Sequence, residues 1–134
     1  MEDYQALGTD GNHKSWPHVE SVKKTKIRER LSSAFVKRVP QTRKLLDHSK
    51  TCKYPVIICG DFNDTPISYN YRQLTNDYWD SFTLSGNGIG GTTTIAPFLR
   101  IDYILLSDEL NSFDYKTHSQ ELSDHRAIST MIEF

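Results

Sequence analysis

Polar side chains follow an apolar run in the middle of the chain. Asp61 and Asn63 belong to a Gly-Asp-Phe-Asn segment that comes directly after the run 54–59. In extended backbone their i, i+2 spacing would point both side chains the same way. A carboxylate binds a hard cation or moves a proton, and an amide donates to a phosphate oxygen. The competing interpretation is an ordinary Asp-Asn turn.

Asp102 lies inside a second apolar run, which extends from Leu99 to Leu106. Aspartate is uncommon in strands and costly to bury without a partner. Strand alternation puts Asp102 on the face of Arg100, so an Arg100–Asp102 ion pair or an outward-facing edge carboxylate are the ordinary explanations. The functional interpretation is that Asp102 orients a histidine, as a carboxylate does behind an imidazole in hydrolytic sites.

A third segment, Ser123-Asp124-His125, comes just before the last predicted strand. His125 can take a proton from water near neutral pH. Asp124 can hold a metal ion directly or through water. The tripeptide by itself is equally typical of a loop, so its meaning depends on the other two segments.

The elements that position these segments begin with a helix. Apolar residues recur every four positions from Ile27, which predicts helix over about residues 20–49, with a kink or a new helix at Pro40. A basic run at 23–30 is either a solvated helix face or a phosphate-tracking surface. The run from Tyr54 to Cys59 predicts a buried strand in which Cys59 is a buried side chain.

Shorter elements follow in the second half of the chain. Ser68 is expected to cap a short helix that ends near Leu74. The stretch 85–94 holds four glycines and predicts a long loop, which either shapes a wall of the site or serves as a flexible connection. Strands are predicted over 99–106, 112–117 and 127–134. The sequence therefore favours an α/β layered domain.

Composition excludes several classes of protein. The 134 residues are 37% hydrophobic and 25% charged, which favours one folded domain. The net charge of −1 argues against a protein that binds nucleic acid by overall charge, although a nuclease with a local basic patch remains compatible. No apolar run approaches the roughly 20 residues of a membrane span. Cys52 and Cys59 make neither a disulfide framework nor a zinc site.

In this order and at these spacings, the three segments resemble the C-terminal signatures of the endonuclease/exonuclease/phosphatase family. That family includes pancreatic-type deoxyribonuclease, abasic-site endonucleases, neutral sphingomyelinases and inositol polyphosphate phosphatases. The resemblance covers roughly residues 40–134. It implies the C-terminal half of a four-layer α/β/β/α sandwich, with a mixed, mostly antiparallel sheet and flanking helices. It also implies hydrolysis of a phosphate mono- or diester with Mg²⁺ or Mn²⁺.

The resemblance implies a role for each site residue. His125 matches the site histidine, a general base or transition-state stabiliser that also contacts the phosphate. Asp102 matches the carboxylate paired with it, and Asn63 the amide that contacts the phosphate. Asp61 matches the acid near the attacking water or the leaving group, and it is also a metal candidate. Asp124 matches a carboxylate near the metal.

The chain departs from the family pattern in its first part. No strand ending in Asn or in Gln-Glu is found there, so a metal-binding Glu cannot be matched. We expect residues 1–18 to be a polar loop or disordered segment and residues 19–134 to be the C-terminal part of the domain. The expected partners are the missing N-terminal half and a phosphoester substrate, either nucleic acid, a phospholipid head group or an inositol phosphate.

Two further expectations follow from the missing half. The isolated chain should show little or no hydrolysis, because hard cations need several oxygen ligands. It should also self-associate through an exposed sheet face. The alternative function is a non-catalytic binding or scaffold module that keeps the fold, although such a module would be expected to lose some of the site residues. The sequence does not indicate a cellular compartment.

Overall fold

The computed structural model of the protein describes residues 38–120 and 122–134, all of which belong to one structural unit, residues 35–134. The described part consists of helices and antiparallel sheets, in agreement with the predicted α/β class. The predicted polar segment 1–18, the basic run 23–30 and most of the first predicted helix lie outside the described residues. No helix among the described residues has the length and apolar character needed to cross a bilayer.

Helices occupy three places in the described part. The first covers residues 38–49 and runs through Pro40 without a break. Helix α2 (Tyr69–Thr75) begins where it was predicted, because the Ser68 hydroxyl accepts a hydrogen bond from the Tyr71 amide at 3.0 Å. Helix α3 (Ser81–Ser85) is capped in the same way by Asp80, a cap that the sequence analysis did not identify.

Within residues 38–120 and 122–134, five strands form two antiparallel sheets. Strands β1 (Ile57–Asp61), β3 (Asp102–Leu106) and β2 (Trp79–Asp80) pair in the order β1-β3-β2. Strands β4 (Asn111–Thr117) and β5 (Ile128–Glu133) make a second sheet, with a register shift between Phe113 and Lys116. The three strands predicted in the second half of the chain are therefore present as β3, β4 and β5.

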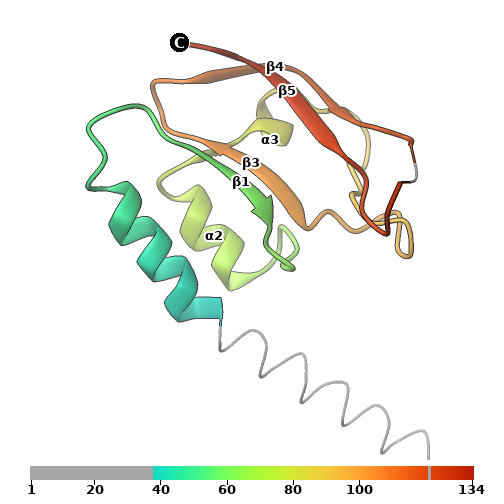
Figure 1. Cartoon of the computed structure of the whole chain (residues 1–134), viewed down its shortest axis with the longest axis horizontal. Coiled ribbons are helices and arrows are strands. Elements are labelled where there is room, and N and C mark those ends of the chain that lie inside the picture. The colour runs from blue at the N-terminus through green and yellow to red at the C-terminus, as the bar shows by residue number, and fades with distance from the viewer. Residues whose placement is uncertain (1–37, 121) are drawn as a thin grey trace, which may run out of the picture. The chain divides into compact units, whose positions relative to one another are not determined.

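The elements stack in three layers (Figure 1). The helix of residues 38–49 and α2 cover one face of the β1–β3 pair, and β4 and β5 lie on the other side, where β5 contacts β3. The core between the helices and the sheet consists of buried side chains from both layers: Leu46, Ile58, Leu74, Tyr78, Tyr103 and Leu105. Fully burying one such aliphatic side chain stabilises the fold by about 1.5–3 kcal/mol.

The prediction that β1 is a fully buried strand was wrong. Ile58 is buried against the helices, but Ile57 is 41% exposed and Cys59 is also exposed. β1 is an edge strand of its sheet, and alternate side chains of a strand point to opposite faces. At β1, the face that bears Ile58 is covered, whereas the face that bears Ile57 and Cys59 is open. The apolar run at 56–59 therefore includes an open face that composition alone could not reveal.

Candidate active site

Two carboxylates meet at one end of the three-stranded sheet. Asp61 ends β1 and Asp102 begins β3, and the two residues are direct partners in the antiparallel register. Side chains of opposed residues lie on the same face, with Cβ atoms about 4.5–5.5 Å apart. Two negative charges in this position repel each other, so the site favours a nearby cation or a proton-bearing group.

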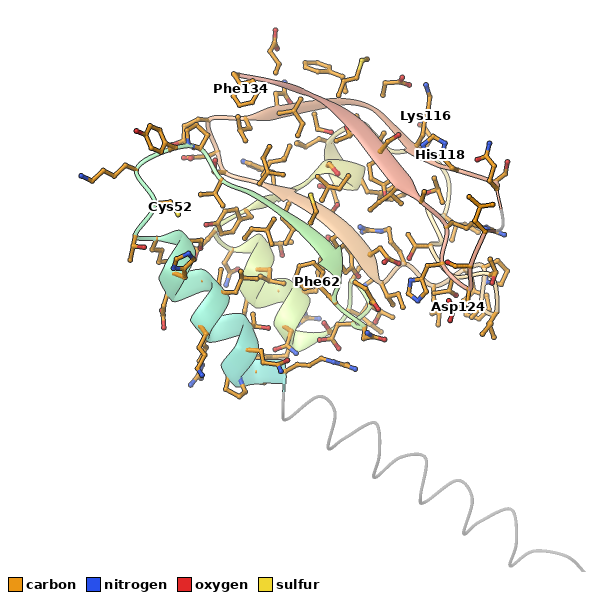
Figure 2. The ribbon with its side chains drawn as sticks, in the orientation of Figure 1. Cys52, Phe62, Lys116, His118, Asp124 and Phe134 are labelled. Carbon is orange, nitrogen blue, oxygen red and sulfur yellow. The ribbon has the colours of Figure 1, made fainter. Side chains whose placement is uncertain are left out.

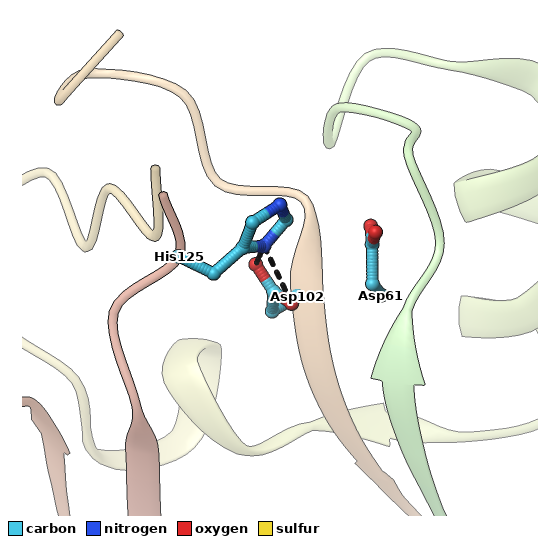
Figure 3. A group of neighbouring side chains, drawn as sticks. All are labelled: Asp61, Asp102 and His125. Atoms are coloured by element: carbon cyan, nitrogen blue, oxygen red, sulfur yellow. Dashed lines mark hydrogen bonds and ion pairs between the residues drawn. The ribbon is translucent and has the colours of Figure 1, made fainter. Parts of the chain in front are cut away.

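His125 supplies that group from the loop that precedes β5. Its Nδ1 lies 2.9 Å from one Asp102 carboxylate oxygen and 3.2 Å from the other (Figure 3). The loop is held in place by an isolated β-bridge between Thr93 and His125. The Ser123 hydroxyl adds two short contacts to the His125 backbone, accepting from its amide at 2.9 Å and donating to its carbonyl at 3.0 Å.

The electrostatic environment of His125 favours its protonated form. The hydrogen bond to Asp102 raises the pKa of His125 above 6.5, and the charges of Asp102, Asp61 and Asp124 act in the same direction, whereas burial acts against them. Because Nδ1 faces Asp102, the other ring nitrogen, Nε2, points away from that carboxylate (Figure 3). The geometry therefore leaves one imidazole nitrogen available for proton transfer or for an anionic group.

The Gly-Asp-Phe-Asn segment turns sharply after β1. Asn63 has a φ of 50°, in the left-handed region, so the expectation that Asp61 and Asn63 share extended backbone was wrong. The Asn63 amide nitrogens nevertheless lie beside Asp61: the backbone N–H and the side-chain Nδ2 each donate to an Asp61 carboxylate oxygen at 2.8 Å. Asparagine tolerates this backbone conformation better than most residues.

Phe62 and Tyr103 anchor this turn to the core. Phe62 packs edge-on against Tyr103, with ring centroids 5.6 Å apart, and lies on the helix side of β1 (Figure 2). The Tyr103 hydroxyl lies 2.6 Å from the Asp64 carbonyl oxygen and 2.8 Å from the Arg100 carbonyl oxygen. Tyr103 thus ties together the backbone segments that carry Asp61 and Asp102.

Further supporting residues were missed by the sequence analysis. Asp64 is 2% exposed and accepts hydrogen bonds from Asn70 at 2.7 Å and from Arg38 at 3.3 Å. Thr92, in the glycine-rich loop, accepts from the backbone amides of Ile101 and Asp102 at 3.1 and 3.2 Å. Asp64 directly follows the Gly-Asp-Phe-Asn segment, and this position could have indicated a supporting role. Nothing in the sequence indicated Thr92, because its contacts join distant segments.

Arg100 does not pair with Asp102. Its guanidinium contacts the carboxylate of Asp80, and both side chains are buried, at 5% and 1% exposure. The same guanidinium lies over the rings of Phe82 and Tyr103, 4.4 and 4.8 Å from their centroids. β3 begins only at Asp102, so Arg100 is outside the strand and strand alternation does not apply to it. Asp102 is therefore left to contact His125.

Asp124 is exposed and stands apart from the other acids. Figure 2 shows it on the loop before β5, where its backbone carbonyl accepts a hydrogen bond from the Thr94 amide at 2.9 Å. Its carboxylate does not belong to the group formed by Asp61, Asp102 and His125. Among the described residues, the structure brings four of the five predicted site residues together, and Asp124 influences His125 only through its charge.

The grouped side chains offer donors that suit a small hard cation. One donor atom from each of Asp61, Asp102 and His125 lies within 4.8 Å of the others. Mg²⁺ commonly uses one or two protein carboxylates and completes its octahedron with water and substrate phosphate. Asp61 is the more exposed of the two carboxylates, and its two oxygens already accept hydrogen bonds from Asn63. The donor set thus fits a divalent hard cation with few protein ligands.

Comparisons with known proteins concern the family and the fold of this chain. The model of the endonuclease/exonuclease/phosphatase family matches residues 31–125. A conserved protein of unknown function from Enterococcus faecalis V583 shares the fold, with a TM-score of 0.60 and 20% identity over 75% of this chain and 44% of that one. A mannosyl-6-phosphatase from Bacteroides thetaiotaomicron VPI-5482 gives a TM-score of 0.50 and 22% identity over 80% of this chain and 46% of that one. This chain therefore spans less than half of either relative. No curated protein sequence matches it.

Proposed function

Because this chain belongs to the endonuclease/exonuclease/phosphatase family, we propose that its full-length parent hydrolyses a phosphate mono- or diester with Mg²⁺ or Mn²⁺. Family membership supports phosphoester hydrolysis as the general chemistry. The observation that carries the proposal is the grouping of Asp61, Asp102 and His125 at one end of the sheet. Nucleic acid, a phospholipid head group and an inositol phosphate all remain candidate substrates.

In this proposal His125 is the residue that handles the proton. Asp102 accepts from Nδ1 and so holds the imidazole with Nε2 directed away from it. In its neutral form the ring accepts a proton from the attacking water at Nε2, and in its protonated form it donates to a phosphoryl oxygen. The raised pKa of His125 extends the protonated form, and with it the second role, to higher pH than an ordinary imidazole would allow.

Asp61 and Asn63 are assigned to the phosphate. The Asn63 side-chain nitrogen has two N–H groups and one of them contacts Asp61, so the second can donate to a non-bridging oxygen. The same contact holds the Asp61 carboxylate beside the position of the attacking water or the leaving group. Both residues are exposed, as a site that receives substrate from solvent requires.

Asp61, with Asp124 as a more remote contributor, is the proposed ligand for the cation. When bound, a divalent ion would offset the negative charge of the phosphoryl group and lower the pKa of a coordinated water. These two carboxylates are too few for a strong site by themselves. The remaining ligands would come from water, from substrate and from the part of the domain that precedes this chain.

We also propose that the open face of β1 is covered in the parent. Ile57 and Cys59 are exposed on one face of β1, and apolar sheet faces are normally buried against another layer. The solved relatives extend to more than twice the matched length, which is consistent with a further half. In the isolated chain, a second copy would cover the same face and cause self-association.

The test is hydrolysis of a nitrophenyl phosphate diester and monoester by the parent protein. Activity should disappear with EDTA and return with Mg²⁺ or Mn²⁺. His125→Ala should reduce kcat by ~100- to 10,000-fold, the usual contribution of a positioned acid or base. Lys116→Ala, on the exposed part of β4, is the matched control and should leave kcat unchanged. Robust turnover by the isolated chain, lost in His125→Ala, would contradict the proposed half site.

A further inference from the structure

The helix of residues 38–49 faces the Gly-Asp-Phe-Asn segment across a cavity of about 240 Å³. One wall of the cavity is the segment 61–64, and the other is formed by Arg38, Gln41, Thr42 and Leu45 of the helix. Asp61 and Asn63 are the residues that the proposed function assigns to the phosphate. The helix layer therefore reaches the proposed active site at this cavity, where its side chains can act on the turn that carries these two residues.

Arg38 connects the two walls with one side-chain nitrogen. Its Nη1 donates to the Asn63 carbonyl oxygen at 2.9 Å and to Asp64 Oδ1 at 3.3 Å. Hydrogen bonds that involve an ionised group are about twice as strong as neutral ones. The side chain of Arg38 is 26% exposed and that of Asp64 only 2%, so solvent screens this pair less than it screens a surface ion pair. These contacts therefore link the helix to both residues at the end of the turn.

Asp64 gives Arg38 a fixed point of attachment. Its second carboxylate oxygen accepts a hydrogen bond from the Asn70 side-chain amide of α2 at 2.7 Å, in a buried environment. Its carbonyl oxygen accepts a hydrogen bond from the Tyr103 hydroxyl of β3 at 2.6 Å. Asp64 is thus held to α2 and to β3 at once. A buried carboxylate is costly unless it is paired and hydrogen-bonded, and within the described residues the cation that pairs with it is Arg38.

The backbone of Asn63 needs such support. Its φ of 50° lies in the left-handed region, which residues other than glycine adopt rarely and keep where the surrounding structure imposes it. On one side, Asp61 accepts hydrogen bonds from the Asn63 backbone and side-chain amides at 2.8 Å. On the other side, Arg38 holds the Asn63 carbonyl. Because φ and ψ set the direction of the carbonyl relative to the side chain, fixing the carbonyl also fixes the direction of the side-chain amide.

We propose that Arg38 is a positioning residue for the active site, which acts through Asn63 and does not touch the substrate. By holding the Asn63 carbonyl and the Asp64 carboxylate, it keeps the turn in the conformation that places the Asn63 amide beside Asp61. The catalytic consequence rests on the function proposed above, in which Asn63 donates to a phosphoryl oxygen. The positioning itself concerns only the conformation of the turn. The competing explanation is that the Arg38–Asp64 pair stabilises the fold and nothing more.

Hydrogen exchange in the 134-residue chain separates these two explanations. Arg38→Met removes the donor and keeps an unbranched side chain. Exchange of the Asn63 backbone amide with water, measured by NMR, should become about tenfold faster, as expected for the loss of one hydrogen bond to a charged group. The resonances of the Asn63 side-chain amide should shift as well, because its hydrogen bond to Asp61 weakens. Arg43→Met, at an exposed position of the same helix, is the matched control and should change neither.

A conservative substitution tests whether the contact itself matters. Both hydrogen bonds come from a single nitrogen of Arg38, so the ammonium group of a lysine can replace it. Arg38→Lys should therefore restore most of the protection at Asn63 that Arg38→Met removes. Arg38→Gln, a neutral donor with a shorter reach, gives the same comparison should Arg38→Met not fold, and it should protect Asn63 less than Arg38→Lys does.

The location of the change decides between the two roles. If Arg38 positions the turn, exchange should accelerate more at Asn63 than at the buried β3 amides of Tyr103 and Leu105. If exchange accelerates by the same factor at all three residues, the whole fold has been destabilised and the proposal is wrong. Unchanged exchange at Asn63 would also overturn it.

The parent protein tests the catalytic consequence. With the nitrophenyl phosphate esters, Arg38→Met should lower kcat by ~10- to 100-fold and leave KM nearly unchanged, because a misdirected amide no longer stabilises the transition state. In an Asn63→Gly background, which lacks the side chain and tolerates the positive φ, Arg38→Met should have no further effect on kcat. Additive losses would contradict action through Asn63. A parent without phosphoesterase activity would refute the proposed function, whereas the exchange rates would still decide this inference.

Discussion

Asp61 and Asp102 are direct partners across β1 and β3, so the two carboxylates stand side by side on one face of the sheet. His125 reduces the repulsion between these two carboxylates by placing Nδ1 2.9 Å from Asp102. The relationship couples the protonation of the histidine to both acids. It also means that a change at either carboxylate can be read from the titration of one imidazole.

Asp102→Asn should lower the pKa of His125, because the hydrogen bond to Asp102 is the largest cause of its elevation. The pKa is measured by following the imidazole resonances in an NMR titration. Asp114→Asn, which alters an acid that pairs with Lys116 on the surface, is the control and should leave the pKa of His125 unchanged. Equal pKa values in wild type and Asp102→Asn would remove the basis for the proposed pair.

The stability of the chain should depend on the protonation of His125. Its pKa is higher in the folded state than the ordinary value of 6.5, so folding is favoured by proton binding. This contribution is fully present below pH 6.5 and is lost as the pH rises through the folded-state pKa. Urea unfolding of wild type and His125→Ala across that range should show a difference in stability that narrows as the pH increases.

Tyr103→Phe should destabilise the fold and loosen the site together. The hydroxyl that it removes shares its one proton between the carbonyl oxygens of Asp64 and Arg100, both in a buried environment. Leaving these acceptors without a donor should cost about 1–3 kcal/mol. Urea unfolding gives the cost, and faster hydrogen exchange at the Asn63 amide would show that the turn has loosened. Unchanged exchange at Asn63 would mean that Tyr103 stabilises the core without positioning the turn.

Asp80→Asn should be among the most damaging single changes outside the site. It leaves the buried guanidinium of Arg100 without its carboxylate, and breaking a buried ion pair costs about 3–5 kcal/mol. Lys116→Ala breaks an exposed pair and should cost about 0–1 kcal/mol. Urea unfolding of each variant measures its loss of stability. Similar costs for the two variants would show that the Arg100–Asp80 contact contributes no more than a surface pair.

Cys59 offers a test of the open face of β1. In a Cys52→Ser background, Cys59 of the isolated chain should react with a maleimide in the native state at low protein concentration, because its side chain is exposed. The reaction should slow at high concentration if copies associate through this face, and it should be slowest in the parent protein. Equal rates in the chain and in the parent would contradict a covering half.

The sequence allowed the secondary structure around the site to be predicted with few errors. The Ser68 cap, the short helix after it and the last three strands are where local signals placed them, since capping and alternation depend on neighbouring residues. Burial was predicted less well. Ile57 and Cys59 are apolar but exposed, because burial depends on which other layer covers a face. The unpredicted Arg100–Asp80 pair has the same explanation.

The amino-acid sequence by itself determined the family and the residue types that its chemistry needs, because three short motifs in a fixed order are local and specific. Tertiary structure decided how those residues meet. Asp61 faces Asp102 through the register of β1 and β3, and the bridge to Thr93 helps to hold His125 beside them. Such contacts join residues that are far apart in the chain, and the backbone pairing and packing that produce them have no local signature.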